Sequence, residues 1–247
     1  MTTELPTTTR TITTMSIPTD SSGLLYLLQI ATATFPTGAF SHSYGFETLI
    51  HDGSIADAMN LRREALLWLR YGIAPSDGVA VAEAYRAAQS GDAERWVKLD
   101  ALLTALKLTR ETREASLSTG MAFLRATLDA FPGEHLDRYN ALVASGLCAG
   151  HYASAFGVAA LDANISLHDA LAAFLHSTLS NLISVAARII PLGQLAVQRI
   201  LAQSQAEILE SARVAMVTPL SDIATSTVQL DIASMAHERL YTRLCIS

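Results

Sequence analysis

The strongest constraint on the fold is the apolar pattern of residues 166–190, which keeps the repeat of an α-helix through several turns. Leucine, isoleucine, phenylalanine and alanine recur three and four positions apart, which places them on one side of a helix. Ser166 followed by Asp169 predicts a capping box at the start, and Pro191 predicts the end. Because apolar residues cover much of its circumference, we expect this helix at the centre of a bundle.

The rest of the chain repeats the helical pattern in shorter pieces. Helices are expected over 24–30, 54–72, 78–89, 93–106, 107–131, 136–149, 152–161 and 192–214. Gly72 is expected to close the second of these, and Pro75 to block its continuation. Half of the residues are hydrophobic but only 6% are aromatic, and no hairpin signal lies between alternating strands. We therefore predict an all-α fold, a single helical bundle domain of roughly ten helices over 23–247, after a disordered leader over 1–22.

Charge and cysteine content exclude several functional classes. A formal net charge of −6 argues against nucleic acid as a partner, because no basic stripe is available to displace counterions. Two cysteines, Cys148 and Cys245, make no disulfide framework and favour a reduced compartment. Residues 1–22 lack the apolar core of a secretory signal. Residues 170–187 carry no formal charge but contain His176 and Asn181, which favours a buried helix over a membrane span. The expected location is the cytoplasm.

The segment TFPTGAFSHSYGFE, residues 34–47, contains the residue types of a catalytic site. One hypothesis is an all-α hydrolase that uses Ser41 or Ser43, although consecutive Ser41, His42 and Ser43 point in divergent directions and would need a distant base. The favoured interpretation is a turn at Pro36 and Gly38, with a serine capping the next helix and Glu47 in its first turn. A binding surface is the third possibility.

Metal and nucleotide signatures are weak or missing. The chain contains no GxxxxGK[ST], HExxH or CxxC pattern. Cys148 and His151 lie three residues apart, but two ligands make an incomplete site. A nickel-binding metallochaperone therefore stays an alternative, and a buried thiol beside a hydrogen-bonded histidine is the favoured interpretation. We expect no cofactor and no resident metal.

Three further segments are distinctive. Residues 107–120 carry alternating charges (Arg110, Glu111, Arg113, Glu114) that are typical of a solvated face. Residues 187–201, ARIIPLGQLAVQRIL, are typical of a junction between helices. In the tail, SMAHERLYTRLCIS, Arg239 and Arg243 flank Tyr241. Arginine and tyrosine often anchor interfaces, so the tail is expected either to order on a partner or to remain a solvated end.

Taken together, these segments resemble the urease accessory protein UreF family. The resemblance rests on LLYLLQIATATFPTGAFSHSYGFE, KLTRETREASLSTG, ARIIPLGQLAVQRIL and HERLYTRLCIS, which follow one another in the family's order and cover residues 24–247. It implies an all-α homodimer that is not an enzyme. Such proteins bridge a UreD/UreH-type accessory protein and the GTPase UreG, in a complex that docks on apo-urease, helps to insert nickel and regulates GTP hydrolysis.

The resemblance also implies which residues bind partners. In the opening loop they are Phe35, Pro36, Gly38, Phe40, Ser41, Ser43, Tyr44, Gly45 and Glu47. At the junction and in the tail they are Arg188, Pro191, Leu192, Gly193, Gln194, His237, Glu238, Tyr241 and Arg243. The chain departs from the family pattern at Ala39, Cys245 and Ile246, where glycine, phenylalanine and arginine are usual.

Overall fold

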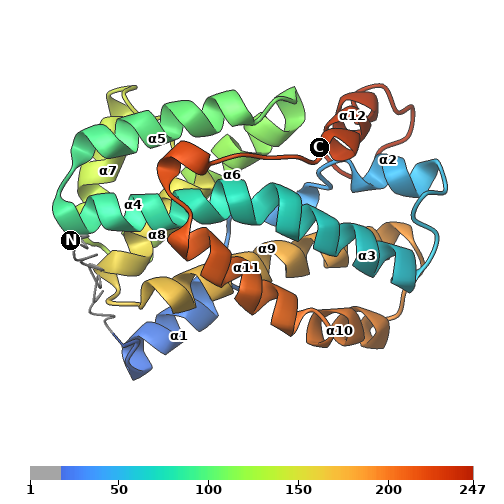
Figure 1. The fold of residues 1–247 in the computed structure, drawn as a ribbon, viewed down its shortest axis with the longest axis horizontal. Helices are drawn as coiled ribbons and strands as arrows, with labels where there is room; N and C mark the ends of the chain where they lie inside the picture. Colours follow the sequence, from blue (N-terminus) through green and yellow to red (C-terminus); the bar gives the residue numbers. More distant parts are fainter. Residues whose placement is uncertain (1–17, 247) are drawn as a thin grey trace, which may run out of the picture.

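The computed structural model describes residues 18–246, and this part of the chain is helical and contains no strand. Figure 1 shows its helices packed as one bundle. The α-helices are α1 (Ser21–Ile30), α2 (Phe46–His51), α3 (Ala58–Trp68), α4 (Val79–Ser90), α5 (Ala93–Leu106), α6 (Arg110–Ala130), α7 (Glu134–Ala144), α8 (Tyr152–Asp162), α9 (Leu167–Ile189), α10 (Gln194–Ala202), α11 (Gln205–Val217) and α12 (Val228–His237). The predicted all-α class and single helical domain are confirmed.

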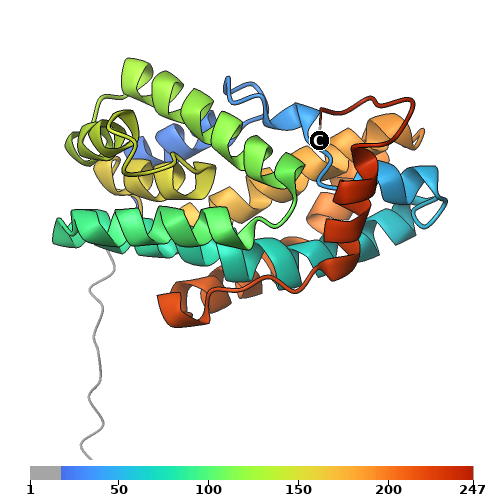
Figure 2. The same ribbon diagram turned by 90° about the horizontal axis from the view of Figure 1, so that it is seen from above.

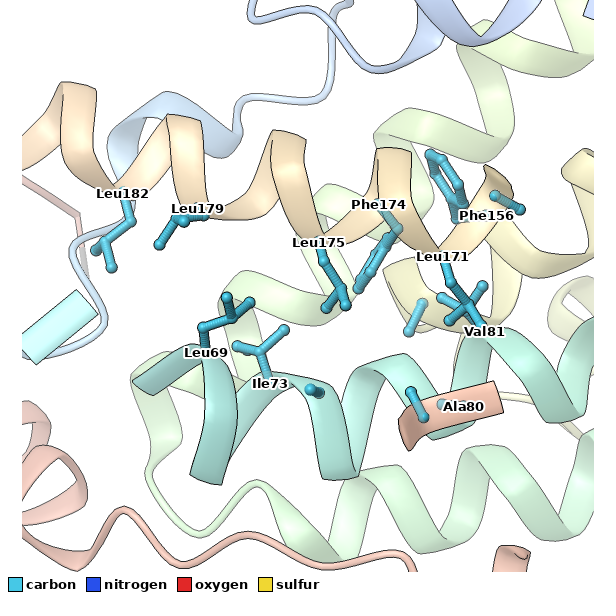
Figure 3. Packing of buried hydrophobic residues seen from close by; sticks show 14 of the residues in the cluster. Leu69, Ile73, Ala80, Val81, Phe156, Leu171, Phe174, Leu175, Leu179 and Leu182 are labelled. Atoms are coloured by element: carbon cyan, nitrogen blue, oxygen red, sulfur yellow. The ribbon is translucent and has the colours of Figure 1, made fainter. Parts of the chain in front are cut away.

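Helix α9 runs through the centre of the bundle, as its apolar pattern predicts. Figure 3 shows Leu171, Phe174 and Leu175 directed at the run of helix formed by η2 (Leu69–Gly78) and α4. These α9 side chains are almost completely buried, and burying each one stabilises the fold by roughly 1.5–3 kcal/mol. The Ser166 side chain accepts a hydrogen bond from the Asp169 amide, which confirms the predicted cap.

The same helix has the length and composition to cross a membrane, since Leu167–Ile189 passes a hydropathy test for a span. More than half of its most apolar window is nevertheless buried inside the domain. Its apolar side chains are therefore used in packing against neighbouring helices, as expected of a core helix.

The expected break at Gly72 and Pro75 is wrong. Helix α3 continues through the π-helical segment η2 into α4, with Pro75 inside the helix. Pro75 has no N–H, so it cannot donate to the carbonyl of Tyr71 four residues earlier. The Ser226 amide donates to that carbonyl at 2.9 Å, and the Ala224 amide donates to the carbonyl of Pro75 at 3.1 Å. The segment at residues 224–226, far along the chain, thus donates two hydrogen bonds to the carbonyls of η2 around Pro75.

The helix expected over 192–214 is two helices, α10 and α11, which meet at Ser204. The Ser204 hydroxyl is buried and donates to the carbonyl of Ile200 at 2.8 Å. Such local side-chain bonds compete with a continuous helix. A further helix, α12, follows in a region where the sequence pattern predicted none.

The start of the domain differs slightly from the expected boundary. Helix α1 begins at Ser21, inside the segment expected to be a leader, and the Asp20 side chain caps it by accepting from the Gly23 amide. The leader expectation for residues 1–17 falls outside the described residues. Figure 2 shows the other end of the chain, where the segment after α12 turns back toward the loop before α2 and the end of α9.

Candidate functional site: a buried cluster that fixes the C-terminal tail

The structure brings the four distinctive sequence segments together at one end of the bundle. Helix α12 packs against α2 and α6, and the tail (residues 239–246) continues from it. At the centre lies a group of charged side chains that we call the C-terminal cluster: Glu47 from α2, Glu111 from α6, His237 from α12 and Arg243 from the tail. These residues are up to 196 positions apart in the sequence, so only the tertiary fold can assemble them.

His237 is the hub of the C-terminal cluster. Its ring is fully buried, with Nε2 at 3.0 Å from a Glu47 carboxylate oxygen and Nδ1 at 2.8 Å from a Glu111 carboxylate oxygen. The Arg243 guanidinium donates to the second Glu111 oxygen at 3.1 Å. Both ring nitrogens of His237 therefore face carboxylate oxygens, and Arg243 adds a positive charge beside the two glutamates. Buried charges persist when they are paired and hydrogen-bonded in this way.

Glu47 also binds the backbone of the tail. The Leu244 amide donates to one carboxylate oxygen at 2.7 Å, and the Cys245 amide donates to the other at 3.0 Å. Burial alone would raise the pKa of Glu47, but these amides and His237 stabilise the ionised carboxylate more, so the pKa is lowered. A further amide, that of Ile246, donates to the carbonyl of Ser41 at 2.8 Å. Residues 244–246, the last part of the tail that the structure describes, are therefore bonded to residues of the opening loop.

The opening loop is shaped by its backbone and not by a serine cap. Helix α2 has Gly45 at its N-cap, with no side-chain cap, so the predicted capping by Ser41 or Ser43 is wrong. The Ser41 hydroxyl donates to the carbonyl of Gly38 at 2.6 Å, and Ser43 is completely buried. Gly45 has a φ of +87°, and a Cβ there would lie 2.8 Å from the carbonyl oxygen of Leu230 in α12. Glycine at this position lets α12 approach the start of α2 closely.

The helix junction closes the other side of the loop. Helix α9 ends at Ile189, one residue after Arg188, whose guanidinium donates to the carbonyl of Phe40. Pro191 and Gly193 are exposed, and Gly193 is the N-cap residue of α10. The Arg188 side chain therefore ties the junction to the loop, which in turn is bonded to the tail.

The predicted site residues fall into three groups by their burial. The buried residues, which cannot touch a partner directly, are Phe35, Ser43, Gly45, Glu47 and His237. The half-buried residues are Gly38, Ser41, Tyr44 and Leu192. The exposed residues are Pro36, Phe40, Arg188, Pro191, Gly193, Gln194, Glu238, Tyr241 and Arg243.

Sequence reasoning missed Glu111 as a member of the site. The solvated face predicted for residues 110–114 is wrong at this position, because Glu111 is only 3% exposed. A signal was present: Glu111 lies four residues before Ala115, which places it on the apolar side of α6. A carboxylate in an apolar stripe indicates a buried partner. Arg110, its neighbour, is exposed and pairs with Glu238 at 3.0 Å.

The second polar cluster, around Cys148 and His151, is structural. His151 is fully buried, with its two ring nitrogens 2.8 Å and 2.9 Å from the hydroxyls of Thr104 and Ser116. Burial lowers the pKa of His151 to about 4, and burial raises the pKa of the Cys148 thiol to about 12. Within residues 18–246, no group of three His, Cys, Asp or Glu side chains could hold a metal ion. The favoured interpretation, a buried thiol near a hydrogen-bonded histidine, agrees with these contacts.

Fold and site together define an all-helical protein in which a buried ionic cluster fixes a C-terminal tail on the surface. A family model described as UreF matches residues 55–205. The urease accessory protein UreF of Paenarthrobacter aurescens (strain TC1) is 35% identical over 223 residues, covering 90% of this chain and 97% of that protein. The corresponding protein of Bacillus sp. (strain TB-90) is 32% identical over 224 residues, covering 91% and 99%. The chain belongs to the UreF family of urease accessory proteins.

Proposed function

We propose that the chain is a non-catalytic scaffold for urease maturation. In this proposal it bridges a UreD/UreH-type protein and the GTPase UreG, and the complex docks on apo-urease, delivers nickel and regulates GTP hydrolysis. Nickel is the cargo of that complex. The chain acts in the cytoplasm, as a homodimer, without a resident cofactor. Membership of a family whose relatives are named urease accessory proteins supports this proposal.

The observation that carries the proposal is a set of exposed apolar side chains on the tail and on the opening loop, two segments whose backbones are bonded to each other. Tyr241, Leu244 and Ile246 of the tail are exposed, as is Phe40 of the loop. Chain ends with such side chains usually fray, but here the backbone amides of residues 244–246 are bonded to Glu47 and Ser41. Exposed aromatic and aliphatic side chains on a fixed backbone are typical of a protein-binding surface. We assign the UreD/UreH-type partner to this surface.

The hydrolase alternative gains no support from the loop. A serine nucleophile must be reachable by substrate and activated by a base. Ser43 is buried, and the Ser41 hydroxyl is already donated to a backbone carbonyl. We therefore propose that the two serines have a structural role in the loop and not a catalytic one.

A pair of matched substitutions tests the partner surface. Tyr241→Ala removes a fully exposed side chain, so the free energy of unfolding should change by no more than about 0.5 kcal/mol. If Tyr241 is an interface anchor, affinity for the UreD/UreH-type protein should fall by at least about tenfold. The control, Leu147→Ala, removes another exposed apolar side chain, from the loop between α7 and α8, and should leave affinity unchanged.

Affinity is measured by titration calorimetry, followed by assembly with UreG on a sizing column and by the nickel content of urease. Equal affinities for the wild type and Tyr241→Ala would contradict the assignment of this surface. Full nickel loading of urease in cells that lack the chain would contradict the scaffold role itself.

A further inference from the structure

A groove runs between α3, α10 and α11, away from the C-terminal cluster. Its volume is about 740 Å³, and Figure 1 shows the three helices side by side at one end of the bundle. Leu66 and the buried Ile200 are among its apolar lining residues. Met59, Leu67 and Tyr71 also line it and are 44% to 74% exposed. Apolar side chains this exposed are unusual beside a concave surface unless another molecule covers them.

Positively charged side chains outnumber negatively charged ones around the groove. Four arginines line it, two from α3, Arg70 from η2 and Arg199 from α10, against two glutamates from α11, in a chain whose net charge is −6. Both glutamates are already engaged: Glu207 lies 3.5 Å from Arg62, and Glu210 lies 2.6 Å from Arg213. Arg70 and Arg199 form no ion pair with any residue from 18 to 246. The groove therefore offers two guanidinium groups that form no ion pair within residues 18–246, and that of Arg70 lies 5.7 Å from the centre of the Tyr71 ring.

We propose that this groove is a second docking site, and that its occupant is an amphipathic helix of another protein, apolar on one face and acidic along the flanks. A helix laid in a groove with apolar anchors one turn apart is a recurring mode of recognition. Acidic flanks would pair with Arg70 and Arg199, which lie on opposite walls. This inference goes beyond the proposed function, because it concerns a surface separate from the tail.

Two other occupants fit the groove less well. A two-fold contact between copies of this chain would place the same concave, arginine-rich surface against itself, which leaves a void and brings like charges together. Residues 1–17 of the chain carry only Glu4 and Arg10 and are rich in threonine. They supply neither an acidic flank nor an apolar stripe.

The test uses two designed helical peptides as probes. Both carry leucines at positions i, i+3, i+4 and i+7, and they differ only in flanking residues, which are glutamates in one and lysines in the other. Fluorescence anisotropy with the full chain should give saturable binding of the acidic peptide, at least about tenfold tighter than the basic one, and weaker in high salt. Arg199→Glu should remove that preference. The control Arg125→Glu makes the same change in net charge on α6 and should keep it.

Several results would overturn the proposal. One is the absence of saturable binding by the acidic peptide, and another is equal affinity for both peptides. A third is a dimeric wild type that becomes monomeric on Leu67→Glu in light scattering, because a second copy would then occupy the groove. Tyr241→Ala should bind the acidic peptide as the wild type does, so failure of the tail assignment and failure of this proposal are distinguishable.

Discussion

Gly45 combines a left-handed backbone with close contact to α12, so the cost of a side chain there can be worked out from the structure. The residue has φ of +87°, and a Cβ would lie 2.8 Å from the Leu230 carbonyl oxygen and 2.9 Å from the Ser234 amide nitrogen. Both atoms belong to the backbone of α12, so the clash cannot be relieved by a side-chain rotation. Gly53 has a similar φ of +82°, but a Cβ there meets nothing within 4 Å. The two glycines share a left-handed backbone, and α12 approaches Gly45 closely while Gly53 is exposed.

The expected cost follows from that difference. Alanine in the left-handed region costs roughly 1–2 kcal/mol, and Gly53→Ala should lose about that much stability. Gly45→Ala carries the same penalty and also forces α12 away, which adds roughly 1–3 kcal/mol as overpacking does elsewhere. We therefore expect Gly45→Ala to be destabilised by about 2–5 kcal/mol in total.

Urea unfolding followed by circular dichroism measures both free energies, and hydrogen exchange of the α12 amides locates the change. Exchange in α12 should accelerate in Gly45→Ala and remain unchanged in Gly53→Ala. Equal losses of stability for the two variants, with α12 equally protected in both, would refute the reasoning that α12 rests on the backbone at Gly45.

Three other outcomes are expected. His237→Ala leaves two buried carboxylates without their shared partner and should cost about 3–5 kcal/mol in urea unfolding, whereas the exposed His51→Ala should cost no more than about 0.5 kcal/mol. The folded-state pKa of Glu47 is lowered from 4.5, so the stabilisation by its ionised carboxylate is present above pH 4.5 and is lost as pH falls below 4.5. In Glu47→Gln the free energy of unfolding should therefore fall less steeply below pH 4.5. Burial and, for Cys245, the Glu47 charge raise the pKa of both thiols to about 12, so iodoacetamide at neutral pH should modify them in urea but not in the folded chain.

The sequence was sufficient where structure is decided locally. Helix α9 is predicted by the spacing of its apolar residues, and its cap by Ser166 and Asp169. Both patterns lie within a few helical turns of each other. Local sequence could not predict that the helix continues through Pro75, because this part of the helix receives hydrogen bonds from a segment near residue 226. The length of the continuous helix from α3 to α4 therefore depends on tertiary contacts.

The candidate site shows the same division. The family resemblance identified Glu47, His237 and Arg243, but nothing in the spacing says that Glu47 and His237, 190 residues apart, share a hydrogen bond. The tail was expected to be either solvated or ordered by a partner. That expectation covered residues 234–247, and its first part is neither solvated nor ordered by a partner, since His237 lies in α12 and is completely buried. A truncation that tests the tail must therefore begin after Arg239, because a cut at residue 236 would remove the hub of the C-terminal cluster.

The backbone of the tail is bonded to the domain while several of its side chains are exposed, and this arrangement lowers the entropy cost of binding a partner. Arg243 and Cys245 contact the C-terminal cluster, while Leu244 and Ile246 between and beyond them are exposed. Fixing the backbone of each residue costs roughly 1–2 kcal/mol in entropy, so ordering residues 243–246 on a partner would cost about 4–8 kcal/mol. Here the cost is met during folding, which leaves a preorganised surface. Glu47→Gln should therefore weaken partner binding although residue 47 is buried, and an unchanged affinity would show that the partner orders the tail by itself.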